Sequence, residues 1–255
     1  MTYINYNYYI YYNNYKYNKL IKNNNIKYIM EEWDKYQLNN KNNIITYDDF
    51  NINNIKYIGG LDISFDKINN KKACAFLTIY DLNTFTIVYE DYNICELEIP
   101  YISGYLGFRE TPQYKILLNK CKNTTYYPDI LMIDGCGILH HKEFGSASQL
   151  GYELNIPTIG VSKTLLCIDG LSEHTIKKQF TEKCIKKGDF INIIGNSNKI
   201  LGAALKSSNN ATNPIYVSIG HKISLETAIK IVTQTCIYKN PEPIRNSDIK
   251  SKLYF

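Results

Sequence analysis

The chain has 255 residues with 44% apolar side chains and a net charge of +5, so it can build a substantial core and tolerate, without requiring, an anionic partner. No segment approaches the roughly 18 to 20 consecutive apolar residues that cross a bilayer, and the N-terminal residues lack the basic and apolar regions of a secretory signal. The seven cysteines stand singly without a CxxC pair, which argues against a disulfide framework and favours a reducing compartment, the cytoplasm or the nucleus.

Residues 1–28 are rich in tyrosine, asparagine and lysine and contain no regular spacing of apolar residues. Segments of this composition are usually disordered, so we expect a tail over residues 1–28 and a folded domain over residues 29–255. A general bias of the coding sequence explains the composition, because the same residue types are frequent throughout the chain. A tail that adheres to RNA is the alternative.

The folded part is predicted to begin with a short helix over residues 30–38. Three strands follow, at 56–66, 72–81 and 85–91. The last two are separated by the short turn Asp81-Leu82-Asn83, and short connections of this kind produce an antiparallel meander.

A helix is predicted over residues 109–123, with Glu110 on the same face as Tyr114. The strand 129–134, a helix over 146–154 and the strand 157–162 then form a βαβ unit, whose two strands are parallel.

A later strand over residues 214–220 leads into a helix over 224–235, for which Ser224 is a suitable N-cap. No interior linker separates the meander from the parallel portion. The sequence therefore predicts a single α/β domain in which helices flank one mixed central sheet.

Three carboxylates stand out in this pattern. Asp62 lies in the centre of an apolar strand, Asp134 ends the strand of the βαβ unit, where open sheets place their sites, and Glu110 lies on the inward face of a helix. Each has a purely structural explanation as well: a bulge for Asp62, a turn for Asp134, and favourable electrostatics at a helix N-terminus for Glu110.

Three carboxylates directed at an apolar sheet would repel one another and lose hydration unless a cation neutralised them. Ligand sets made only of oxygen atoms favour Mg²⁺ or Mn²⁺ over zinc. A carboxylate-bound Mg²⁺ is a common device for hydrolysing phosphodiester bonds, so the sequence predicts a metal-dependent phosphodiester hydrolase.

The chain resembles the endonuclease V family, and specifically its eukaryotic branch. The resemblance spans about residues 30–250 and lies in six blocks that follow the order of the family: GLDISF (60–65), PYISGYLGFRE (100–110), DGCGILHHKEFGSASQLG (134–151), PTIGVSKTLL (157–166), SIGHKISLE (218–226) and PEPIR (241–245). It implies an RNase H-like fold for the single domain.

The resemblance also implies an activity. Family members of this branch cleave inosine-containing single-stranded RNA at the second phosphodiester bond 3′ of inosine, leaving a 3′-hydroxyl and a 5′-phosphate. The implied cofactor is Mg²⁺, for which Mn²⁺ can substitute, and water attacks phosphorus without a covalent enzyme intermediate.

The family's metal-binding acids fall on Asp62, Glu110 and Asp134. Lys163 matches a lysine near the scissile phosphate, although a surface lysine before a helix is the alternative. His221 matches an active-site histidine that could orient water or transfer a proton.

The segment "PYISG" matches the family's wedge, a loop that separates bases beside the modified one; it comprises Pro100, Tyr101, Ile102, Ser103 and Gly104. Tyr101 at its tip could stack on a base, although it is also one of 24 tyrosines. Ser103 corresponds to the eukaryotic pattern, where bacterial members carry proline.

The pocket for the flipped base is implied by Gly135, Cys136, Gly137 and Ile138, with His140 near the substrate. Cys136 departs from the asparagine or histidine of other members, which leaves the base preference open. Cys136 is not expected to act as a nucleophile, because the mechanism needs none.

Two further functions compete with the inosine-specific ribonuclease. One is a DNA repair endonuclease directed at deoxyinosine, and the other is a catalytically silent RNA-binding protein of the same fold. The expected partners are inosine-containing RNA and deaminated DNA, with no membrane partner, and the expected state is a monomer.

Overall fold

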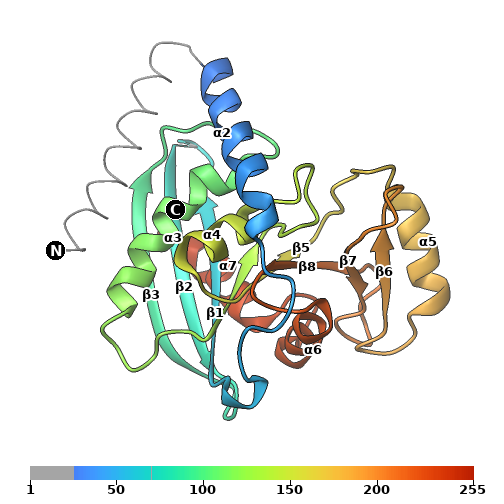
Figure 1. Cartoon of the computed structure of the whole chain (residues 1–255). Coiled ribbons are helices and arrows are strands. Elements are labelled where there is room, and N and C mark those ends of the chain that lie inside the picture. The colour runs from blue at the N-terminus through green and yellow to red at the C-terminus, as the bar shows by residue number, and fades with distance from the viewer. Residues whose placement is uncertain (1–25, 70) are drawn as a thin grey trace.

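Eight strands form one mixed sheet in the order β3-β2-β1-β4-β5-β8-β7-β6, among the residues that this computed structural model describes, 26–69 and 71–255 (Figure 1). Only the pairs β1–β4 and β4–β5 are parallel within this sheet. The predicted single α/β domain with a mixed sheet flanked by helices is therefore confirmed.

The first three strands are the predicted antiparallel meander: β1 spans Tyr57–Phe65, β2 spans Lys72–Asp81 and β3 spans Thr86–Glu96. The third strand runs five residues beyond the predicted end. Strand β1 is central because its other side pairs in parallel with β4 (Ile130–Asp134).

The predicted βαβ unit consists of β4, α4 (Ser146–Leu154) and β5 (Thr158–Ser162), and its strands are parallel. Strand β8 (Ile215–His221) pairs antiparallel with β5, so that Tyr216 at its start lies opposite Ser162. We call the edge at which β4 and β5 end, marked by Asp134 and Ser162, the carboxyl edge of the sheet.

Four elements escaped the sequence prediction: α5 (Glu173–Lys183), β6 (Phe190–Ile194), β7 (Ile200–Leu205) and α7 (Glu242–Ser251). Ser172 caps α5, and Ile176 and Phe180 of this helix pack against β6 and β7. Short 3₁₀ turns cover Lys41–Asn43, Ile52–Asn54 and Lys252–Tyr254.

The first helix, α2, spans Ile26–Asn40 and is longer than predicted. Residues 26–28, which the sequence assigned to the tail, lie inside it, because Ile29, Trp33 and Gln37 form one buried stripe at a spacing of four residues. Trp33 stacks on Phe108 of α3, with ring centroids 4.8 Å apart. The rest of the predicted tail, residues 1–25, lies outside the described residues.

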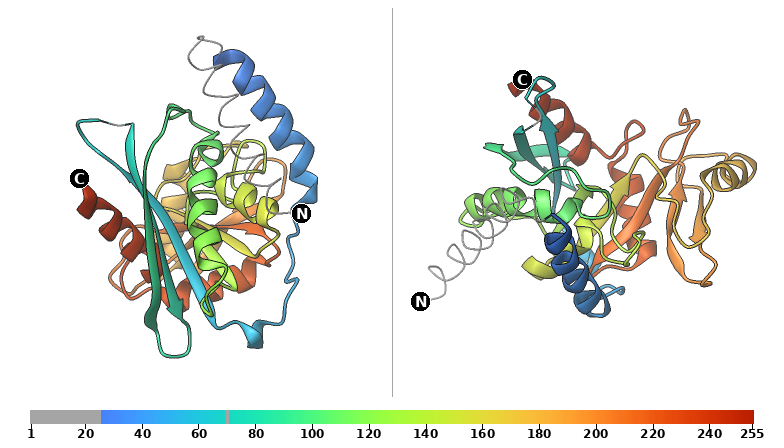
Figure 2. Two further views of the ribbon diagram at one scale, coloured as in Figure 1. Left: turned by 90° about the vertical axis from the view of Figure 1, so that its left-hand side faces the viewer. Right: turned by 90° about the horizontal axis from the view of Figure 1, so that it is seen from above.

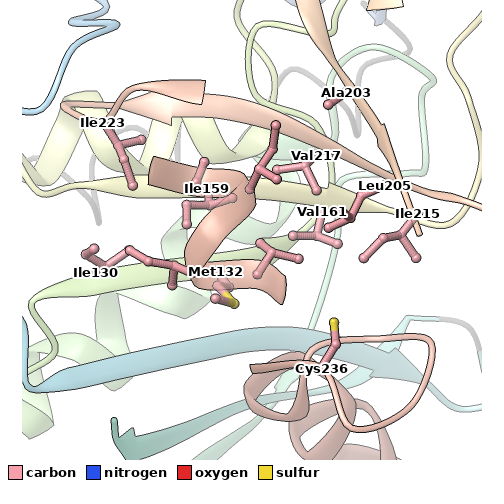
Figure 3. Close-up of a cluster of buried hydrophobic side chains, with 14 of the residues drawn as sticks. Ile130, Met132, Ile159, Val161, Ala203, Leu205, Ile215, Val217, Ile223 and Cys236 are labelled. Atoms are coloured by element: carbon pink, nitrogen blue, oxygen red, sulfur yellow. The ribbon is translucent and has the colours of Figure 1, made fainter. Parts of the chain in front are cut away.

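Helices cover both faces of the sheet (Figure 2). On one face, α3 (Leu106–Cys121) and α4 pack on β1, β2 and β4. On the other, α6 (Leu225–Thr235) packs on a core of aliphatic side chains that includes Met132, Ile159 and Val217 (Figure 3). Ser224 caps α6 as predicted, accepting a hydrogen bond from the backbone N–H of Thr227.

Helix α7 lies on β1 and β2 at the same face as α6. The backbone of Pro243 and Ile244 approaches Gly60 so closely that a side chain at this strand position would overlap it. Among the residues that the structure covers, no helix is long and apolar enough to cross a membrane.

We predict that Gly60→Ala destabilises the fold by about 3 kcal/mol or more, because the added methyl group forces α7 away from β1. Gly59→Ala is the matched control: its methyl group meets the flexible end of Leu131 at 2.8 Å and the ring of Pro128 at 3.2 Å, but no backbone atom of α7, so its loss of stability should be smaller. Urea denaturation of the two variants measures the difference. Equal losses of stability would show that α7 does not pack as described.

Candidate active site

Asp62, Glu110 and Asp134 come together at the carboxyl edge. Leu61 of β1 pairs with Ile133 of β4, so Asp62 and Asp134 are neighbours on adjacent parallel strands. Glu110 reaches them from the first turns of α3, and its charge acts on both Asp62 and Asp134. Asp62 and Glu110 are buried, with 8% and 4% of their surfaces exposed.

A fourth carboxylate, Asp248 of α7, joins this group and was missed in the sequence. Ser247 donates a hydrogen bond to the carbonyl of Gly60 at 2.9 Å, and the hydroxyls of Ser251 and Ser64 lie 2.7 Å apart, which fixes α7 along β1. Asp248 therefore lies against Asp62 and shares a hydrogen bond with it.

The pKa of Asp62 is raised well above its usual range, first by burial and then by the charges of Asp134 and Asp248. Hydrogen bonds from Lys252 and Asp62 lower the pKa of Asp248 although burial opposes them. A hydrogen bond between two carboxyl groups needs a proton on one of them, and the directions of the two shifts make Asp62 the donor and Asp248 the acceptor.

Burial also raises the pKa of Glu110 to about 8, although the hydroxyl of Tyr114 donates a hydrogen bond to Oε2 at 3.1 Å. Glu110 is therefore largely protonated near pH 7. Protonation reduces the negative charge of the group, as a bound cation would.

Lys163 follows β5 and contacts Asp134, with its Nζ 2.9 Å from Oδ2. Burial lowers the pKa of Lys163, but the charge of Asp134 and this hydrogen bond outweigh it, so the pKa is raised. The ammonium thus places a positive charge beside Asp134 at the carboxyl edge.

The chemistry of the four acids fits a divalent cation that prefers oxygen ligands, because they concentrate buried carboxylates where only protons and Lys163 balance them. As they stand in the described residues, no three aspartate, glutamate, histidine or cysteine side chains are arranged to hold a metal ion. Asp134 and Asp248 are each paired with a lysine in this arrangement, Lys163 and Lys252.

A pocket of about 310 Å³ opens beside the acids. It brings together eight of the predicted site residues: Tyr101, Ser103, Gly104, Asp134, Gly135, Cys136, His140 and Lys163. Gln37 of α2 and Ser146 of α4, which the sequence did not suggest, also line it.

Two predicted pocket residues serve the core instead. The N–H of Gly137 donates to Ser218 of β8 at 2.8 Å, and the N–H of Ile138 donates to the carbonyl of Ile219. Ile138 packs against the aliphatic core of Figure 3. These two residues fix the loop to β8 and do not line the pocket.

In the predicted wedge, Tyr101 is 67% exposed and free to stack, and Pro100 is exposed beside it. Ile102 packs against the cluster of Ile29, Trp33 and Phe108, which attaches the loop to α2 and α3. Burial raises the pKa of Cys136 to about 11, so its thiol stays protonated near pH 7 and is a poor nucleophile.

The carbonyl of Gly104 connects the wedge to the pocket, because two buried side chains donate to it. Nε2 of His140 lies 2.9 Å from this oxygen and Nε2 of Gln37 lies 3.0 Å from it. Gln37 also donates to the carbonyl of Phe144 at 3.1 Å. His140 thus supports the loop that it belongs to and the wedge.

The structure does not bring His221 to the acids. It ends β8 opposite Thr158, where β5 begins, because β8 is antiparallel to β5 and runs away from the carboxyl edge. Nδ1 of His221 accepts a hydrogen bond from Ile45 at 3.3 Å, and the side chain is 3% exposed. The expected catalytic role of His221 is inconsistent with this position.

Comparison with known proteins identifies relatives of this domain. A sequence model described as endonuclease V matches residues 39–249. Mouse endonuclease V is 40% identical over 202 residues, which cover 78% of this chain and 60% of the mouse protein. A putative endonuclease of Schizosaccharomyces pombe is 40% identical over 243 residues, or 91% of this chain and 95% of that protein.

Solved structures agree with the sequence matches. The catalytic domain of human endonuclease V superposes with a TM-score of 0.85 at 33% identity, covering 89% of this chain and 95% of that one. Endonuclease V of Ciona intestinalis, in complex with a DNA containing an inosine followed by a ribo-adenosine, gives 0.84 at 35% identity, covering 88% and 97%.

We predict that His140 makes the fold sensitive to acid. Burial lowers the pKa of His140 to about 4, aided by the charges of His141 and Lys142 and opposed by the bond to Gly104. The unfolded chain takes up the proton near pH 6.5 and the folded protein only near pH 4. The contribution of His140 to stability is therefore fully present above pH 6.5 and falls by up to about 3 kcal/mol as the pH decreases from 6.5 to 4.

Urea denaturation at pH 7 and pH 4.5 measures this effect. His140→Gln, which retains a donor for Gly104, should lessen the loss of stability between the two pH values by about 2 kcal/mol. His174→Gln, on the exposed face of α5, is the control and should leave the loss unchanged. An unchanged pH dependence in His140→Gln would refute the prediction.

Proposed function

Because the chain belongs to the endonuclease V family, whose members are nucleases and therefore phosphodiester hydrolases, we propose that it is a Mg²⁺-dependent endonuclease for inosine-containing single-stranded RNA. The proposed cut lies at the second phosphodiester bond 3′ of inosine and leaves a 3′-hydroxyl and a 5′-phosphate. The observation that carries the proposal is the group of four carboxylates beside a pocket large enough for a base.

In this proposal Asp62, Glu110, Asp134 and Asp248 hold Mg²⁺, or Mn²⁺ in its place. The bound cation would act as a Lewis acid on the phosphate and make water acidic enough to attack it. Lys163, released from Asp134, would place its ammonium beside the charge that develops on the phosphate oxygens. No covalent bond to the protein is needed.

The pocket would receive the flipped inosine base. Backbone groups of Gly135 and Cys136, which line the pocket, could bond to the edge of hypoxanthine, and Tyr101 could stack on the neighbouring base. Gln37 and His140 are positioning residues here, since they hold the carbonyl of Gly104 between wedge and pocket.

RNA and DNA each have support as the substrate. The complex of the Ciona intestinalis protein contains DNA in which a ribonucleotide follows the inosine, which agrees with a preference for ribose at that position. The DNA of the same complex keeps a deoxyinosine-directed DNA repair endonuclease as the second candidate. A silent RNA-binding protein is disfavoured because all four acids are present.

The proposal predicts that the protein cleaves an inosine-containing RNA oligonucleotide in Mg²⁺ and leaves a matched adenosine oligonucleotide intact. Single-turnover rates on RNA and DNA versions of one sequence decide between the two nucleases, and we expect the RNA to be cleaved faster. Cleavage of neither version would refute the proposed function.

Asp62→Asn is the matched control, because it keeps the shape of the side chain and removes its charge. We expect its cleavage rate to fall by a factor of about 10³ or more, as for the loss of a central catalytic group. Binding of inosine RNA should remain within a few-fold of the unaltered protein, since the base pocket and wedge are untouched. Normal cleavage by this variant would refute the metal assignment.

We predict that Tyr101→Ala weakens binding of inosine RNA roughly five- to a hundredfold, the effect of losing one base–aromatic stack. Single-turnover cleavage at saturating protein should stay close to that of the unaltered protein, because the ring supplies no charge to the phosphate. Tyr126→Ala, an exposed tyrosine away from the pocket, is the control. Normal binding with lost cleavage would instead place Tyr101 among the catalytic residues.

A further inference from the structure

A second hollow, of about 500 Å³, lies at the carboxyl edge and has no role in the function proposed above. Its walls are Lys187, the loop over residues 208–213 and the segment 237–239 between α6 and α7. Leu205 and Ile215, which flank the loop, pair with each other, and the adjacent Tyr216 pairs with Ser162. The hollow is therefore at the same edge of the sheet as Asp134 and Lys163.

The two hollows belong to different parts of that edge. The base pocket is built from α2, the start of α3 and the loop before α4, on one face of the sheet. The second hollow is built from segments that follow β7 and α6, whose helix covers the other face. Lys163 of the carboxyl edge lines the base pocket and is not among the residues that line the second hollow.

The walls of the second hollow carry positive charge that no lining acid balances. Lys187 and Lys239 are its charged residues, and asparagine, serine and threonine side chains supply the remaining polar groups. The ammonium of Lys187 donates to the carbonyl of Cys236. Burial lowers the pKa of Lys239, and so do the charges of Lys177 and Lys163, so the ammonium of Lys239 lies within reach of the charges of both lysines.

Tyr238 adds an aromatic surface beside these lysines and is 60% exposed. The guanidinium of Arg245 lies 4.9 Å from the centre of its ring, and Glu242 holds Arg245 through two bonds of 2.7 and 2.8 Å. The ring is thus supported by Arg245 of α7 while much of its surface faces solvent. Lysines that face a groove and a supported aromatic ring are the elements that bind phosphates and bases of a single strand.

We propose that this hollow binds the nucleic-acid strand on the 3′ side of the cleaved bond. Lys187 and Lys239 would contact its phosphates, and Tyr238 would stack on one of its bases. The direction of the strand rests on the proposed function, in which the modified base occupies the first pocket and the cut lies 3′ of it.

Binding in EDTA, where the strand stays intact, tests this assignment. Two inosine oligonucleotides share one 5′ part; one ends just beyond the cleaved bond and the other extends about ten nucleotides further 3′. For Lys239→Ala we expect a three- to tenfold loss of affinity for the extended strand at low salt and none for the short one. The slope of log Kd against log salt concentration should decrease by about 0.7 for the extended strand.

Tyr238→Ala should weaken the extended strand roughly five- to a hundredfold and leave the salt slope unchanged, because the ring is neutral. Lys56→Ala is the matched control: Lys56 is an exposed lysine beside Tyr57, at the opposite edge of the sheet where β1 begins. It should bind both strands like the unaltered protein. Thermal unfolding confirms that each variant is folded.

Equal losses on the short and extended strands, or an equal loss in Lys56→Ala, would overturn the proposal, because they would reflect overall charge alone. A response to a 5′ extension in place of the 3′ extension would overturn it as well. If the unaltered protein bound the extended strand through Lys239 but cleaved neither oligonucleotide in Mg²⁺, the hollow would stand and the proposed function would fail.

Discussion

Mutual repulsion among four carboxylates is the constraint around which this molecule is arranged. Asp62, Asp134 and Asp248 come from two parallel strands and a helix packed on them, and Glu110 comes from a helix at the opposite face. Holding them together in a buried place costs free energy that protons and lysines offset only in part. The core of the domain supplies the rest, because each acid sits on an element that is fixed by apolar packing.

The register of the central strands determines which side chains meet at the site. Shifting β1 by one residue against β4 would move Asp62 to the other face of the sheet, away from α7. The close approach of α7 at Gly60 fixes the position along β1 at which Asp248 meets Asp62. The antiparallel strands at both ends of the sheet extend the core, and this core keeps the central strands in register.

Continuous apolar runs predicted the strands that carry the carboxyl edge, β1, β2, β4 and β5, and helical spacing of apolar residues predicted α6. Asp248 was missed because its place in the site depends on contact with β1, a strand far earlier in the chain. No local sequence pattern encodes such a contact. His221 was misplaced for a related reason: the sequence around it reveals a strand but not the strand's direction. In α7, the spacing of Ile244, Ser247 and Ser251 by three and four residues marks the buried face beside which Asp248 lies.

Gln37 and His140 both bond to the Gly104 carbonyl, and through Gln37 helix α2 supports the wedge. The match to the family begins only at residue 39, after most of α2. Trp33 and Gln37 lie before that point: Gln37 lines the base pocket, and Trp33 belongs to the cluster against which Ile102 of the wedge packs. A chain trimmed to the matched residues would keep all four carboxylates and lose both residues. The shape of the pocket therefore depends on α2, a helix that carries none of the four acids.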